Sequence, residues 1–145
     1  MNLLKQTIDD KGLIEDLIPQ KAPFVMVDKL IYFSSEKVIT GFTPASSNLF
    51  VHNKRFMATG LIEHMAQSVA LHTGYQYYLK NEPAPTGYIG AIKLAEILDL
   101  PGVDQELITT VTILHDILGV TLVQIQVNCN GKIMANSEMK TVLAN

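Results

Sequence analysis

The sequence predicts an α+β fold in which an antiparallel sheet wraps around one long central helix. Apolar residues recur at three- and four-residue steps from Leu61 to Ala70, which is typical of a helix. Four strand-like segments then follow one another with only turn residues between them. Consecutive strands after one long helix favour an antiparallel sheet packed on that helix.

The expected elements cover most of the chain. The helix over about 58–80 is apolar on more than one face in its first half, which is typical of a helix enclosed by other structure. Thr59 is expected to cap it, and Pro83 and Pro85 to follow its end. The other expected elements are a short helix at 13–18, a hairpin of strands 24–33 and 37–43, a polar loop at 44–53, and strands 87–98, 106–115, 120–128 and 132–143. Turns are expected at Pro101-Gly102, Leu118-Gly119 and Asn130-Gly131.

Length and composition restrict the classes of function. The chain has 145 residues, of which 48% are hydrophobic and 17% charged, so one globular domain over 1–145 is expected. The net charge is −3 with no run of Lys or Arg, which argues against nucleic-acid and membrane surfaces. A small basic patch could include Lys54, Arg55 and Lys93, so the composition is compatible with an acidic carrier protein as partner.

The lone Cys129 cannot form an internal disulfide, which favours a reducing compartment. The first ten residues do not resemble a signal peptide, and no apolar run reaches the roughly 20 residues of a membrane span. A cytoplasmic location is therefore expected.

Two segments resemble the β-hydroxyacyl-(acyl carrier protein) dehydratases, which have the hotdog fold. Ile18-Pro19-Gln20-Lys21-Ala22-Pro23-Phe24-Val25-Met26-Val27-Asp28-Lys29 is similar to the family's Leu-Pro-His-Arg-x-Pro-Phe-Leu-Leu-Val-Asp-Arg, and Glu63-His64-Met65-Ala66-Gln67 to its Glu-x-Met-Ala-Gln. Weaker agreement follows at Gly87–Lys93 and at Pro101-Gly102. Within the family the chain looks closest to a branch of aryl-polyene pigment pathways, on Asn48, Arg55, Gly60–Gln67 and His72.

The resemblance implies that Glu63 is the catalytic acid on the central helix. Dehydration needs a base for the C2 proton, an acid for the 3-hydroxyl and a donor for the thioester carbonyl. In the family a Glu and a His move the protons, and a main-chain N–H near the helix start serves the carbonyl. Gln67, Gly60, Phe50 and Ile92 are assigned to substrate binding. Gln67, one turn after Glu63, either holds that carboxyl or only satisfies a buried polar group.

The family's histidine is missing from its expected position. It stands fourteen residues before the Glu, where this chain has Leu49. His52, three residues later, is either a substitute base or an ordinary loop histidine. His64 points about 100° away from Glu63 and is expected to pack or to lie at the surface, and His72 faces nearly the opposite way, some 13 Å along the axis. His115 is expected to face solvent. No pair of histidines has the spacing of a metal site, and neither metal nor cofactor is expected.

Three functions remain open from the sequence. The first is a dehydratase acting on 3-hydroxyacyl thioesters of acyl carrier protein or coenzyme A, in fatty-acid or aryl-polyene type biosynthesis. The second is a non-catalytic partner that binds acyl carriers or completes a hotdog heterodimer. The third is an acyl thioesterase of the same fold, in which a helix carboxylate activates water. The resemblance implies a homodimer or an oligomer of dimers, with sites at the seam between subunits.

Overall fold

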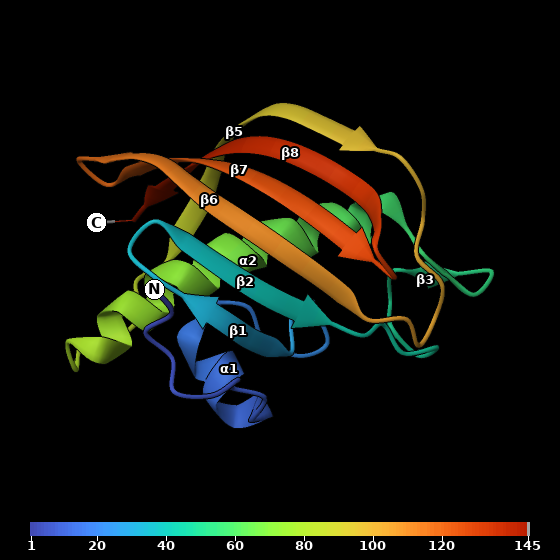
Figure 1. Ribbon diagram of the computed structural model, residues 1–145, viewed down its shortest axis with the longest axis horizontal. Coiled ribbons are helices and arrows are strands. Elements are labelled where there is room, and N and C mark those ends of the chain that lie inside the picture. Colours follow the sequence, from blue (N-terminus) through green and yellow to red (C-terminus); the bar gives the residue numbers. More distant parts are fainter. Residues whose placement is uncertain (145) are drawn as a thin grey trace.

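A six-stranded antiparallel sheet curves around one long helix, α2, in a computed structural model that describes residues 1–144 (Figure 1). The sheet order is β1-β2-β6-β7-β8-β5. The strands are β1 (Lys29–Phe33), β2 (Lys37–Phe42), β5 (Gly87–Ile97), β6 (Leu107–Ile117), β7 (Val120–Cys129) and β8 (Lys132–Leu143). This confirms the predicted α+β arrangement, and the four strands after the helix lie within two residues of their predicted bounds.

Two of the strand connections are tight turns at the predicted residues. Leu118 and Gly119 have φ angles of 54° and 78°, and Asn130 and Gly131 have 52° and 77°. Positive φ at both central residues is the pattern of the type I′ turn, whose twist matches that of a hairpin. The turns therefore set the register in which β6 pairs with β7 and β7 with β8.

The central helix α2 (Ala58–Leu79) is enclosed on several faces, as its apolar pattern predicts. Even polar side chains are buried along it, and the Ser68 and Thr40 hydroxyls share a hydrogen bond of 2.7 Å between helix and sheet. Its buried residues are Gly60, Leu61, His64, Met65, Gln67, Ser68, Val69, Leu71, His72, Gly74 and Tyr75.

The short helix α1 (Lys11–Leu17) packs closely against α2. Asp10 caps its start by accepting a hydrogen bond of 3.1 Å from the main chain of Leu13. At the contact, a Cβ added to Gly74 would lie 1.8 Å from the carbonyl oxygen of Leu17, so only glycine permits this approach. The close contact brings the chain that leaves α1 alongside α2.

The strand predicted at 24–33 begins only at Lys29. The main chain before it is satisfied by a side chain instead of a neighbouring strand. Gln67 Oε1 accepts from the N–H of Met26, and Gln67 Nε2 donates to the carbonyl of Phe24. The first part of this segment is therefore extended chain held by α2.

Two further predictions are wrong in detail. The expected loop at 44–53 includes a strand, β3 (Val51–His52), which pairs with β4 (Arg55–Phe56) in a small hairpin. Thr59 does not cap α2, because the helix begins earlier: the N-cap residue is Met57, which makes no side-chain capping bond.

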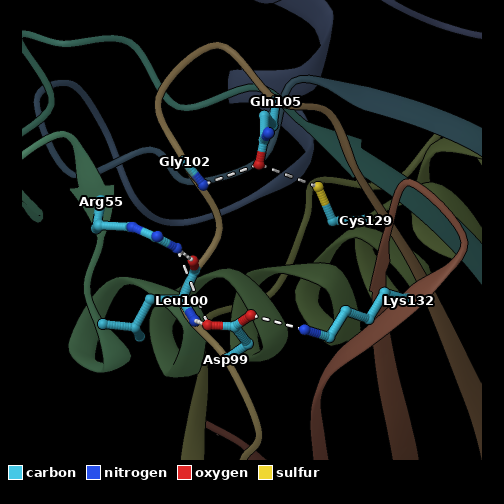
Figure 2. A network of polar contacts seen from close by, with 7 residues as sticks. All are labelled: Arg55, Asp99, Leu100, Gly102, Gln105, Cys129 and Lys132. Atoms are coloured by element: carbon cyan, nitrogen blue, oxygen red, sulfur yellow. Dashed lines mark hydrogen bonds and ion pairs between the residues drawn. The ribbon is translucent and has the colours of Figure 1, made fainter.

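A polar network anchors the connection between β5 and β6 to the β3–β4 hairpin (Figure 2). Arg55 Nη1 donates to the carbonyl of Leu100 at 2.7 Å, and Arg55 also forms an isolated β-bridge with Gly102. Asp99 pairs with Lys132 of β8 at 2.9 Å. Because the hairpin leads directly into α2, these contacts help to fix where the central helix begins.

Candidate functional site

Glu63 lies on α2 at a cavity of about 280 Å³ that runs between the helix, the ends of β5 and β8 and the chain after α1. Glu63, Ala66, Ala70 and Thr73 follow one another at steps of three and four, so they form one stripe of the helix that is about 15 Å long. The small alanine side chains leave room beside the helix. The lining residues are Pro19, Gln20, Glu63, Ala66, Val69, Ala70, Thr73, Pro85, Gly87, Tyr88, Ile89, Thr141 and Leu143.

The Glu63 carboxyl is held by Gln67, which is fully buried. Gln67 Nε2 donates to Glu63 Oε1 at 2.9 Å and to the Phe24 carbonyl at 2.8 Å. The orientation of the amide is fixed because its Oε1 accepts from the Met26 N–H at 2.6 Å. Gln67 was predicted either to hold the Glu63 carboxyl or only to satisfy a buried polar group. In the structure its amide bonds to the main chain and also holds one oxygen of Glu63. Gln67 therefore engages one oxygen of the carboxyl, Oε1.

His64 extends this network to the sheet. Its ring is fully buried, with Nδ1 2.6 Å from the Met26 carbonyl and Nε2 2.7 Å from the Thr109 hydroxyl. A carbonyl only accepts, so Nδ1 carries the hydrogen and Nε2 accepts from Thr109. Burial lowers the pKa of His64 to about 4. His64 is therefore a neutral packing residue, which was one of its two predicted placements.

Gly60 and Phe50 meet at the start of α2. A Cβ added to Gly60 would lie 2.4 Å from the Phe56 ring and 2.8 Å from the Phe50 Cβ, so the glycine lets both aromatic residues pack on the first turn. The Phe50 carbonyl accepts from the Met57 N–H at 2.9 Å. The structure brings these two predicted binding residues together, but neither lines the Glu63 cavity.

Leu49 and His52 lie outside the Glu63 cavity. Leu49, at the family's histidine position, is 45% exposed and lines a separate cavity of about 360 Å³. His52 is exposed on β3, pairs across the hairpin with Arg55 and lines a surface hollow with Lys54. Within one chain, the structure does not bring His52 to Glu63.

The cavity at Leu49 also contains Asp28, whose carboxyl is incompletely satisfied. Asp28 Oδ2 accepts from the Thr43 N–H at 3.1 Å, while Oδ1 is buried and has no partner. Burial raises the pKa of Asp28 above its ordinary value.

The remaining predicted residues lie apart from the cavity. Ile92 is 42% exposed on β5, which forms one edge of the sheet. His72 is buried against Phe33, and its Nε2 lies 2.8 Å from the Ser34 carbonyl. His115 is exposed on β6, as predicted. Over residues 1–144, no histidine lines the Glu63 cavity, and no three His, Cys, Asp or Glu side chains come together as a metal site.

Of the cavity residues, the sequence predicted only Glu63 as a site residue, and Gln20 is the most notable of those it did not predict. Gln20 lines the cavity with Glu63, and its Oε1 is buried without a partner. A signal was available, since Gln20 occupies the third position of the Ile18-Pro19-Gln20-Lys21 stretch, where the resembling family has His.

Comparison with known families places the chain by sequence. The profile of the ApeP-like family, described as ApeP dehydratase, matches residues 13–145. The chain belongs to the ApeP-like dehydratase family. This confirms the predicted relationship to aryl-polyene dehydratases. No curated protein matches the sequence significantly.

Solved structures show that this ApeP-like chain has the hotdog fold. The dehydratase heterocomplex ApeI:P from Xenorhabdus doucetiae is similar at a TM-score of 0.84 and 17% identity, over 91% of each chain. The smu.793 protein from Streptococcus mutans bound to acetyl CoA is similar at a TM-score of 0.67 and 11% identity, over 88% of this chain and 96% of that chain. A hypothetical thioesterase with coenzyme A from Streptococcus pneumoniae is similar at a TM-score of 0.63 and 9% identity, over 80% of this chain and 84% of that chain. The family profile thus places the chain among the ApeP-like dehydratases, and the solved structures show its fold.

In the described part of this ApeP-like chain, no helix combines the length and apolar character needed to cross a membrane.

Proposed function

We propose that the chain is a dehydratase subunit for 3-hydroxyacyl thioesters, with Glu63 as the proton donor to the departing hydroxyl. The observation that carries the proposal is the placement of Glu63. One oxygen is held by Gln67, and the carboxyl stands at one end of a cavity beside α2 whose lining includes the apolar side chains of Val69, Ile89 and Leu143. An acyl chain fits such a cavity because its methylenes leave water there, at about 0.8 kcal/mol for each buried CH₂. The thioester arrives on acyl carrier protein or coenzyme A.

The proposed reaction forms one double bond and releases one water. A base takes the proton from C2, the C2–H electron pair forms the C2=C3 bond, and the C3–O bond breaks. The hydroxyl leaves with the proton of Glu63, so Glu63 ends as a carboxylate and is reprotonated before the next turnover. The first turn of α2 offers main-chain N–H groups to the thioester oxygen, since Met57 makes no side-chain capping bond there.

The base is proposed to come from a second subunit. None of the histidines within 1–144 lines the Glu63 cavity, and β5 ends the sheet as an edge strand of eleven residues. The cavity borders that edge through Gly87, Tyr88 and Ile89. A hotdog partner pairing with β5 would therefore reach the cavity. A different hotdog chain that carries the family's histidine supplies the missing group, whereas a second copy supplies only Leu49 or His52. A heterocomplex as in the ApeI:P structure supports this choice.

The test uses the chain alone and after co-expression with a hotdog protein that retains the family's histidine fourteen residues before its Glu. Mass spectrometry follows 3-hydroxyacyl carrier proteins for loss of 18 Da, the mass of water. We expect turnover from the pair and at least a hundredfold less with Glu63→Gln, because a positioned acid contributes about 10²–10⁴-fold. Glu82→Gln, an exposed carboxyl just after α2, is the control and keeps full activity. Unchanged activity of Glu63→Gln would refute the proposal.

Hydrolysis of the thioester is the second candidate. The observation that favours it is that Glu63 lines its cavity without a histidine among residues 1–144, since a single carboxylate is enough to activate water. The hypothetical thioesterase with coenzyme A among the similar structures agrees with this chemistry. Free thiol released from acyl-CoA by the chain alone, without loss of water from 3-hydroxyacyl substrates, would favour the thioesterase.

A further inference from the structure

Gln20 is a polar residue of the Glu63 cavity that the proposed chemistry has not yet used. Its side chain lines the same cavity, from the stretch that follows α1. The amide oxygen Oε1 is buried and has no hydrogen-bond partner. Gln67, the other glutamine beside Glu63, differs in that its oxygen and its nitrogen are both satisfied by the protein.

An unpaired buried acceptor is costly to the folded protein. Leaving such a group unsatisfied costs about 1–3 kcal/mol, whereas an apolar side chain of the same length fills the space without this penalty. Packing alone therefore does not account for a glutamine at position 20. The cost is offset when a ligand in the cavity supplies the hydrogen that the protein does not supply.

We propose that Gln20 binds the O–H group that exchanges a proton with Glu63, and this inference rests on the proposed function. In dehydration that group is the 3-hydroxyl of the substrate. Its hydrogen is donated to Gln20 Oε1, which turns a lone pair of the hydroxyl oxygen toward the proton on Glu63. At the hydroxyl oxygen, only the proton of Glu63 is transferred. The hydroxyl hydrogen keeps its covalent bond to that oxygen and its hydrogen bond to Gln20 while the C3–O bond breaks and water departs.

The side chain has the freedom to make this contact. Gln20 is partly exposed and lines the cavity although its Oε1 is covered, and rotation about the terminal torsion is the movement proposed to turn that oxygen toward the ligand. Gln67 does not rotate in this way, because the Met26 N–H holds its oxygen. The two glutamines therefore have different roles. Gln67 holds the carboxyl of Glu63, and Gln20 orients the hydroxyl that Glu63 protonates.

The inference is tested by binding, so that turnover is not needed. The probes are octanoyl pantetheine and 3-hydroxyoctanoyl pantetheine with an amide in place of the thioester, and the protein includes its hotdog partner where one co-purifies. Calorimetry compares their affinities for the wild type, Gln20→Met and Thr73→Val. Thr73 lines the same cavity ten residues beyond Glu63 and serves as the control.

We expect the wild type to prefer the 3-hydroxyl probe by about fivefold, the value of one net hydrogen bond. Gln20→Met should bind both probes about equally, and Thr73→Val should keep the preference. Gln20→Met should also keep or raise the melting temperature, because it removes an unpaired polar atom from the folded state. A preference that survives in Gln20→Met, or a lowered melting temperature with both affinities lost equally, would overturn the role of Gln20. A wild type that binds neither probe would overturn the proposed function itself.

Discussion

Gln67 donates to Glu63 across 2.9 Å while the main chain of Met26 holds Gln67 at 2.6 Å. The acid of the candidate site is thus tied to the extended segment between α1 and β1. Through the neighbouring His64, whose Nδ1 donates to the Met26 carbonyl, the same segment is tied to Thr109 on β6.

Gln67→Leu should lower the free energy of unfolding by roughly 2–4 kcal/mol. The substitution keeps the volume but leaves the Met26 N–H and the Phe24 carbonyl without partners, and each buried unsatisfied group costs about 1–3 kcal/mol. Urea titration measures the change. Gln76→Leu on the same helix is the control and should shift stability by about 0.5 kcal/mol or less. Equal effects of the two substitutions would contradict the network.

His64 makes stability depend on pH. Its pKa is lowered from 6.5 to about 4 in the folded state, so the unfolded chain binds the proton more readily. The contribution of His64 is complete above pH 6.5 and is lost as pH falls toward 4, by roughly 3 kcal/mol in total. Denaturant titrations at several pH values measure the slope. His64→Gln should flatten this slope, whereas His115→Gln, on an exposed ring, should leave it as in the wild type. An unchanged slope in His64→Gln would count against the assignment.

Asp28→Asn should stabilise the folded protein at neutral pH. Burial raises the pKa of Asp28, so the charged form is disfavoured on folding and the penalty is present above the folded pKa. The neutral amide still accepts from the Thr43 N–H through its oxygen. The gain should vanish in acid, where Asp28 is itself protonated. Melting temperatures of both proteins across pH 3–8 test this, and a gain that persists in acid would show that charge is not its cause.

Gly74→Ala should lower stability by roughly 3 kcal/mol. The new Cβ would lie 1.8 Å from the Leu17 carbonyl oxygen, so α1 and α2 must separate, and overpacking of this kind costs about 1–3 kcal/mol or more. Ser68→Ala on the same helix is the comparison, and it removes the hydrogen bonds of one hydroxyl to Thr40 and to the His64 carbonyl. Chemical denaturation compares them. A Gly74→Ala protein as stable as the wild type would mean that the contact is not required.

Local patterns in the sequence were sufficient for most of the fold. The apolar repeat of α2 and the turn residues Leu118-Gly119 and Asn130-Gly131 are properties of short segments, and these elements lie within a few residues of their predicted bounds. The strand over 24–33 was predicted too long because its first residues pair with Gln67, some forty residues away. A contact between residues so far apart in the sequence does not change the apolar periodicity of either segment.

The candidate site was less predictable than the fold. Motif similarity located Glu63 and Gln67, since both lie on one regular helix. Gln20 lies in a stretch that the motif comparison covered, but its unpaired oxygen becomes visible only when its whole surroundings are known. Proximity in sequence suggested His52 as a substitute base, yet the β3–β4 hairpin carries it to the surface, outside the Glu63 cavity.

The edge strand β5 has a consequence for the lifetime of the chain in a cell. Along its eleven residues, only β8 pairs with it among the described residues, and the large apolar side chains of Tyr88, Ile89 and Leu94 are exposed. Any protein that binds this edge adds its binding free energy to the folded state by mass action. Protease resistance of the chain should then follow the supply of that protein. Synthesis in excess of it would leave surplus chains that are degraded first.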